Sequence, residues 1–185
     1  MRLLLPALAA AVALAACAGG ETETVSVTET RTETATATET ETVTDTVAEA
    51  VGLPPEVAET HAALLEAAES GDYEALRPLI PADGFSYTFG EPPPGGPIEY
   101  WQQVETDSGE SPIEILARIL RLPYTLSVGT YVWPFAYDKT EDELTDYERE
   151  LLGDLAVYSG AGSGYLGWRA GIEPDGTWRF FIAGD

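Results

Sequence analysis

Residues 168–182, WRAGIEPDGTWRFFI, predict a β-hairpin and therefore an antiparallel sheet. The segment from Glu173 to Thr177 fits a type I turn with Gly176 in the left-handed conformation, as in three-residue hairpin loops. Pairing the two ends of this turn sets the register. The predicted cross-strand pairs are Ile172 with Trp178, Ala170 with Phe180, and Trp168 with Ile182. All are apolar and share one face, so the turn chemistry and the hydrophobic pattern agree.

The opposite face of this hairpin is predicted to be bare and basic. It holds Gly167, Arg169, Gly171, Arg179 and Phe181. Because guanidinium groups bind carboxylates and phosphates with paired hydrogen bonds, Arg169 and Arg179 are candidates for binding an anionic ligand. The alternative is structural pairing, since residues 51–185 contain 24 acidic side chains.

A helix is predicted upstream, at residues 56–69, because apolar side chains recur there at helical spacing. The predicted buried stripe is Val57, His61, Leu64, Leu65 and Ala68. Ser70-Gly71 ends this helix, and Asp72 is expected to cap a short second turn.

Two more helices are expected to begin with proline, at Pro97 and at Pro112. In the second, Ser111 and Glu114 are spaced as a capping box, and Glu114 and Arg118 are spaced as an ion pair. Its predicted buried residues are Ile115, Leu116, Ile119, Leu120 and Leu122.

Two strands are predicted among these helices, at residues 85–89 and 129–137. The second carries four aromatic residues on one face, Tyr131, Trp133, Phe135 and Tyr137. Such a row either stacks on sugar rings or forms part of the core. Tyr131 and Trp133 are therefore candidate binding residues, and the core remains the alternative.

Residues 138–150 are acidic but lack the spacing of a calcium-binding loop, so no metal is predicted there. Thr140 and Glu143 instead fit the capping box of a helix with an apolar stripe at Leu144, Tyr147, Leu151 and Leu155. The glycines at 160–164 lack the lysine of a phosphate-binding loop. No cofactor is expected.

The fold class predicted for residues 51–185 is α+β, with several helices packed on a small curved antiparallel sheet that ends in the C-terminal hairpin.

The run Ser70-Gly71-Asp72-Tyr73-Glu74-Ala75-Leu76 after the first helix, together with the Trp168-Arg169 to Trp178-Arg179 hairpin, resembles the nuclear transport factor 2-like superfamily. The resemblance implies a cone-shaped pocket between helices and a curved sheet. The helices predicted between 97 and 155 depart from the usual arrangement of that superfamily.

Enzymes of this superfamily place an Asp, His or Tyr in the cone for proton transfer. The matching candidate is His61, with Asp72, Tyr73 or Tyr87 as partners, and histidine titrates near neutral pH. The alternative is a core histidine with satisfied hydrogen bonds. This enzyme hypothesis, of isomerase, dehydratase or hydrolase type, stands beside a non-catalytic binding module and a structural domain that contacts other proteins.

The N-terminus indicates export. Arg2 precedes an apolar run from Leu3 to Leu14, which is too short to span a bilayer and is typical of a signal peptide. Leu14-Ala15-Ala16-Cys17 resembles the lipobox of bacterial lipoproteins, which implies cleavage after residue 16 and acylation of Cys17. Ordinary signal peptidase cleavage after Ala18 is the alternative. The whole chain is similar to lipoproteins of GC-rich bacteria, a likeness that implies no particular activity.

Between anchor and domain lies a spacer, residues 17–50. Every even position from Thr22 to Thr46 is threonine except Ser26, and acids are frequent between them. Because neither face is apolar, we expect a solvated, disordered segment, with O-linked sugars as a further possibility.

The formal net charge of −23 argues against a nucleic-acid partner. The predicted partners are the outer face of a bacterial membrane, through Cys17, and a ligand or protein of the cell envelope.

Replacing Cys17 tests the anchor. In the native host, Cys17→Ala is expected to release the protein from the membrane fraction and to remove the diacylglyceryl mass from its N-terminus. Centrifugal fractionation and intact mass spectrometry measure both. A Cys17→Ala protein that stays with the membrane would contradict the lipobox interpretation.

Overall fold

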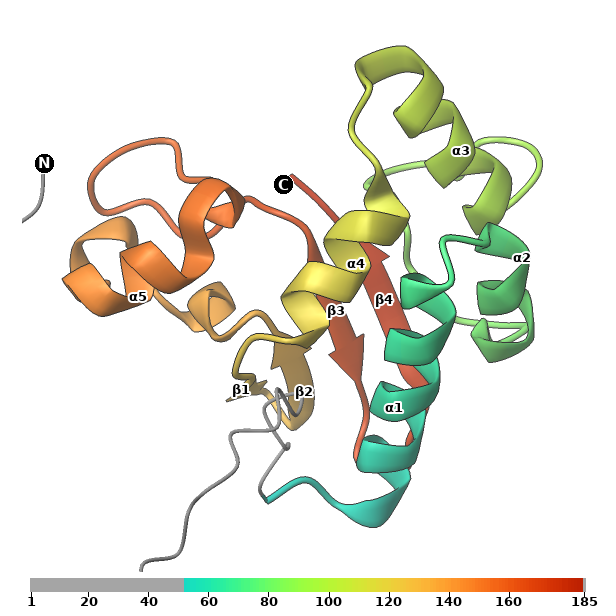
Figure 1. Cartoon of the computed structure of the whole chain (residues 1–185), viewed down its shortest axis with the longest axis horizontal. Helices are drawn as coiled ribbons and strands as arrows, with labels where there is room; N and C mark the ends of the chain where they lie inside the picture. The colour runs from blue at the N-terminus through green and yellow to red at the C-terminus, as the bar shows by residue number, and fades with distance from the viewer. Residues whose placement is uncertain (1–51, 185) are drawn as a thin grey trace, which may run out of the picture. The chain divides into compact units, whose positions relative to one another are not determined.

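The computed structural model describes residues 52–184, and this region has the predicted α+β fold (Figure 1). The predicted signal peptide, Cys17 and the spacer lie outside the described residues. The helices are α1 Pro55–Glu69, α2 Tyr73–Leu76, α3 Pro97–Ser108, α4 Pro112–Leu120 and α5 Asp146–Leu152. The strands are β1 Thr125–Ser127, β2 Thr130–Trp133, β3 Arg169–Ile172 and β4 Trp178–Ile182. Short 3₁₀ helices occupy Arg77–Leu79, Phe135–Asp138, Glu141–Glu143 and Gly153–Leu155. Among the described helices, none has the length and apolarity needed to cross a membrane.

The strands form one antiparallel sheet in the order β1-β2-β3-β4. Helices α1 and α4 pack against each other and against β3, and Figure 1 shows both on one face of the β3–β4 hairpin. The main core lies between these layers, and its largest fully buried side chains include Trp101, Trp133, Trp178 and Phe181. The segment between β2 and β3, which contains α5, builds a second small core from Phe135, Ala136, Leu144, Leu152 and Tyr165.

The C-terminal hairpin has the predicted turn but only part of the predicted register. Glu173 N donates to Thr177 O at 2.9 Å, and Gly176 has φ 84°. Ile172 pairs with Trp178 as predicted, but the register then shifts at a β-bulge, so Ala170 pairs with Phe181 rather than Phe180. The extra residue is Arg179. Because the bulge adds one residue, it turns Phe181 into the core, where it is 0% exposed.

The bare basic face predicted for this hairpin is therefore wrong. Phe180 covers Gly171 so closely that a β-carbon there would lie 2.3 Å from the ring. Arg169 donates to the Gly184 carbonyl at 2.6 Å and lies against the ring of Phe89. The guanidinium of Arg179 lies over Gly84 and pairs with Glu173 at 3.4 Å.

Neither internal strand forms over its full predicted length. Residues 85–89 contribute one isolated parallel bridge, between Ser86 and Phe180, rather than a strand. The 129–137 strand ends at Trp133, because Pro134 has no amide hydrogen to donate. The amide of Phe135 then donates to Pro123 O at 2.7 Å, outside the sheet.

The helix predictions hold in position and differ in detail. All five predicted stripe residues of α1 are buried, and Asp72 caps α2 by accepting from Glu74 N at 2.9 Å. Helix α4 begins at Pro112, but Ser111 makes no side-chain cap. Arg118 pairs with Asp154 rather than with Glu114, which ties α4 to the segment after α5.

The 138–150 region forms two short helices instead of one. Each begins with its own capping box, Thr140 with Glu143 and Thr145 with Glu148. The break between them changes which apolar side chains point inward. Leu144, Leu152 and Leu155 are buried, whereas Tyr147 is 71% exposed and Leu151 is 37% exposed.

Gly171 is required by the Phe180 ring. Gly171→Ala is expected to destabilise the domain by about 1–3 kcal/mol, because the new methyl group overpacks that ring. Urea unfolding measures the change, and Gly164→Ala is the control, since nothing lies within 4 Å of a β-carbon there. Adding Phe180→Ala should recover part of the loss. Equal effects at Gly164 and Gly171 would contradict this packing.

Candidate functional site

His61, the catalytic candidate, lies in the main core rather than in an open site. It is 6% exposed, and its ring stacks on Trp133 with centroids 4.9 Å apart. Its Nε2 is 2.8 Å from Leu120 O, and because a carbonyl only accepts, Nε2 carries the proton. Burial lowers the pKa of His61, and the hydrogen bond to Leu120 opposes this shift. The ring is therefore held neutral in a structural contact.

The suggested partners of His61 have other roles. Asp72 caps α2, and Tyr73 donates to Glu105 Oε2 at 2.7 Å. Burial first, and then this hydrogen bond, raise the pKa of Tyr73 to about 12. Tyr87 lies near Pro93 O, at 3.5 Å. Among the described residues, no hydrogen bond or ring contact joins any of the three to His61.

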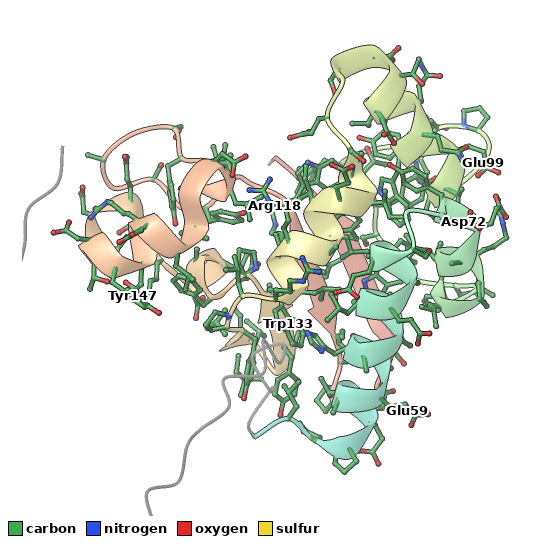
Figure 2. All side chains as sticks on the ribbon, in the orientation of Figure 1. Glu59, Asp72, Glu99, Arg118, Trp133 and Tyr147 are labelled. Atoms are coloured by element: carbon green, nitrogen blue, oxygen red, sulfur yellow. The ribbon has the colours of Figure 1, made fainter. Side chains whose placement is uncertain are left out.

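The aromatic candidates Tyr131 and Trp133 also belong to the main core. Tyr131 is half-buried and packs on Tyr124, with ring centroids 5.5 Å apart. Trp133 is buried between His61 and Tyr124, and Figure 2 shows it beside α1. The structure thus separates these two aromatic residues from Arg169 and Arg179, whose side chains contact other parts of the chain.

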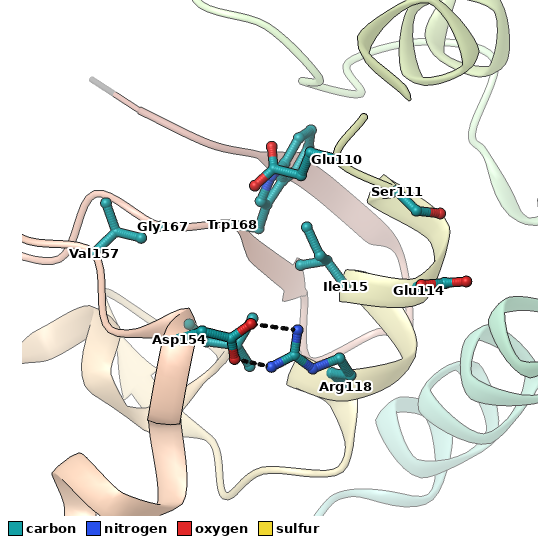
Figure 3. Close-up of a pocket in the computed structure, with 10 residues that line it drawn as sticks. Glu110, Ser111, Glu114, Ile115, Arg118, Asp154, Val157, Gly167 and Trp168 are labelled. Carbon is teal, nitrogen blue, oxygen red and sulfur yellow. Dashed lines mark hydrogen bonds and ion pairs between the residues drawn. The ribbon is translucent and has the colours of Figure 1, made fainter. Parts of the chain in front are cut away.

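One cleft lies between α4 and the segment after α5, with a volume of about 220 Å³ (Figure 3). Its arginine and its indole N–H are already paired. Arg118 Nη1 donates to Asp154 Oδ2 at 3.2 Å and Nη2 donates to Oδ1, and Trp168 Nε1 donates to Glu110 Oε2 at 3.0 Å. A ligand here would have to replace these contacts.

A larger cleft, of about 390 Å³, lies between α5 and the start of β1. We call it the α5 cleft. Its lining includes Tyr124, Phe135, Lys139, Tyr147, Glu148 and Leu151. The lining is mainly aromatic and aliphatic, and Tyr147 and Leu151 are the exposed apolar residues of α5. Figure 2 shows Tyr147 projecting from α5. Its lining offers a ligand mainly apolar contact.

The charged groups of the α5 cleft neutralise each other. Lys139 Nζ pairs with Glu148 Oε1 and lies 5.8 Å from the centre of the Phe135 ring. Glu148 Oε2 also accepts from Thr145 N at 2.9 Å. The hydrogen bond from Lys139, followed by that from Thr145, lowers the pKa of Glu148 to about 2. The ion pair holds the base of α5 in place and leaves the cleft without net charge.

The β1–β2 hairpin next to this cleft ends in an unusual turn. Val128 and Gly129 have φ 49° and 87°, the positive values of a type I′ loop. A β-branched residue in this conformation is strained. Val128 is also 104% exposed, and Leu126 on the same hairpin is exposed, so neither gains from packing within the domain. Packing within the domain therefore does not offset the strain at Val128.

The described chain also begins at this side of the domain. A β-carbon on Gly52 would lie 3.6 Å from the hydroxyl of Tyr124, which lines the α5 cleft. Gly52, the first described residue, therefore lies beside a residue that lines the cleft.

Comparison with protein-family models, with curated proteins and with solved structures found no match to this chain. Among the described residues, no group of three His, Cys, Asp or Glu side chains is arranged to hold a metal ion.

Sequence reasoning missed the α5 cleft because it assigned Tyr147 and Leu151 to a buried stripe. A second capping signal, Thr145-Asp146-Tyr147-Glu148, was available to correct this. Starting the helix at Asp146 makes Leu152 the inward residue and leaves Tyr147 outside.

Relieving the strain at Val128 is expected to stabilise the domain. Val128→Asn creates the Asn-Gly pair favoured in type I′ turns and should raise the free energy of unfolding by about 1 kcal/mol. Urea unfolding measures this. The control is Val157→Asn, at another exposed valine without a positive φ, where no gain is expected. Destabilisation by Val128→Asn would show that the turn does not strain Val128.

Proposed function

We propose that this protein is an exported, lipid-anchored binding module that captures a partner protein of the bacterial cell envelope in its α5 cleft. The observation that carries the proposal is the cleft itself: an open, aromatic-lined hollow of about 390 Å³ with exposed Tyr147 and Leu151 at α5. Exposed apolar surface beside a shaped hollow is typical of interaction sites.

Binding fits the geometry better than catalysis. His61 lines neither of the two clefts described above, and its Nε2 proton is already donated to Leu120. The two charged groups that line the α5 cleft, Lys139 and Glu148, are paired with each other, so neither is free to exchange a proton with a substrate.

The charge around the cleft indicates the chemistry of the partner. Residues 138–150 contain seven acids and two bases. Lys139 and Glu148 pair inside the cleft, so the excess negative charge of this segment comes from acids that do not line it. We therefore infer that the partner contributes an apolar polypeptide segment flanked by basic residues. The acidic surface attracts the basic residues, whereas it would repel an anionic ligand.

The spacer explains how such a module reaches its partner. Fully extended, a chain of about 30 residues spans about 100 Å. Anchored at Cys17, the domain would search a volume above the membrane while remaining attached to it.

Site-specific photo-crosslinking in the native host tests the proposal. A photoreactive phenylalanine analogue at position 147 is expected to crosslink one basic envelope protein. The same analogue at Glu59, an exposed position on α1 well away from α5 in Figure 2, is expected to give no such product. Mass spectrometry of the crosslinked species identifies the partner.

A second substitution distinguishes capture in the cleft from chance proximity. Leu151→Ser, combined with the analogue at position 147, should lower the crosslink yield about tenfold or more, because apolar contact in the cleft is lost. Val157→Ser is the matched exposed control and should leave the yield unchanged. Crosslinking that is equal at positions 59 and 147, or insensitive to Leu151→Ser, would overturn the proposal.

A further inference from the structure

Two indole N–H groups in the main core have no hydrogen-bond partner within residues 52–184, those of Trp101 and Trp178. Trp101 lies in α3 and is 0% exposed, and Trp178 begins β4 and is 1% exposed. Their ring centroids are 5.9 Å apart, so both donors belong to one aromatic cluster. Buried donors are almost always satisfied in native proteins, and an unsatisfied pair indicates an acceptor that the fold itself does not supply.

This cluster borders a third cleft, of about 330 Å³. Phe85 lines the cleft, and its ring centroid lies 4.7 Å from that of Trp178 and 6.1 Å from that of Trp101. Tyr87 lines the same cleft and stacks on Phe85, with centroids 6.4 Å apart. Phe85 therefore lines the cleft and also contacts both indole rings.

The backbone around Phe85 is fixed while its side chain is only half-buried. Ser86 N donates to Arg179 O, and Phe181 N donates to Ser86 O, each at 3.0 Å. These bonds hold the segment on the edge of β4. A rotation of the Phe85 side chain would leave these backbone hydrogen bonds in place.

We propose that rotation of Phe85 exposes the indole N–H groups of Trp101 and Trp178 to the third cleft, and that the resulting site binds a neutral sugar ring. The hydroxyl and ring oxygens of a sugar accept hydrogen bonds from the indoles, and its apolar face packs on aromatic rings such as Tyr87. The cleft lies within the size range of small-ligand sites. This site is separate from the α5 cleft and does not depend on the function proposed above.

The charge of the site favours a neutral ligand over an anion. Arg77 lines this cleft and already pairs with Glu74 at 2.7 Å and Glu99 at 3.2 Å. Arg179, which lies over the lining residue Gly84, pairs with Glu173 at 3.4 Å. Residues 51–185 also carry a net charge of −17, which repels anions. A sugar hydroxyl is uncharged, so it needs no unpaired cation and is not repelled by the acidic domain.

Indole resonances report on the site directly. The mature full-length chain, labelled with ¹⁵N-tryptophan and held in detergent micelles, is titrated with methyl glucoside and, separately, with sodium acetate. The Nε1–H signals of Trp101 and Trp178 are expected to shift saturably with the glucoside alone. The signal of Trp168 should not move, because its N–H donates to Glu110. Trp→Phe variants assign the signals.

Variants add an independent measurement. Trp101→Phe and Trp178→Phe should each weaken glucoside binding about tenfold, the effect of one lost hydrogen bond, whereas Trp168→Phe should not. Phe85→Ala should speed solvent exchange of both indole protons. Shifts with acetate instead of glucoside would overturn the ligand class. No shift of either signal in the wild-type chain, up to the solubility limit of the glucoside, would overturn the site, whether or not the variants fold.

Discussion

His61 joins three elements of this domain. Its side chain leaves α1, donates to Leu120 O at the last residue of α4, and stacks on Trp133 of β2. The last carbonyls of a helix lack partners within the helix, so this bond satisfies a group that burial would otherwise leave unpaired. The distance between α1 and α4, and the position of both on the sheet, depend on this contact. The same constraint explains why this histidine is neutral in an acidic protein. A charged ring would lose its solvation on burial and would gain no ion pair with a carboxylate.

The fold could be predicted wherever local chemistry and burial agree. Residues 55–69 form the expected helix because the spacing of Val57 to Ala68 leaves one buried face, and Gly176 sets the terminal turn. The prediction failed where a non-local contact determines the strand register or the partner of a side chain. The bulge at Arg179 depends on Phe180 packing over Gly171 and on Ser86 approaching β4 from outside, and neither contact is visible in the spacing of residues 168–182. Arg118 likewise pairs with Asp154, 36 positions away, rather than with its helical neighbour.

The residues of the candidate site could not be predicted. The aromatic residues selected as binding candidates, Tyr131 and Trp133, belong to the core. The α5 cleft arises where residues 134–168 pack against the start of β1, and this packing is not encoded in local periodicity. The segment that contains α5 has its own small core, and the Arg118–Asp154 pair ties it to α4. A module built this way can vary its contact surface while α1, α4 and the sheet stay unchanged.

The Lys139–Glu148 pair has a practical consequence for chemistry on this protein. Lys139 is the only lysine in the chain, and it lines the α5 cleft. Reagents that modify amines therefore have one side-chain target, and that target lies at the surface where we place the partner. A dye, a spin label or an immobilisation linker attached through lysine reports on this cleft without a designed cysteine, and attachment to an amine-reactive support would block the surface it is meant to present.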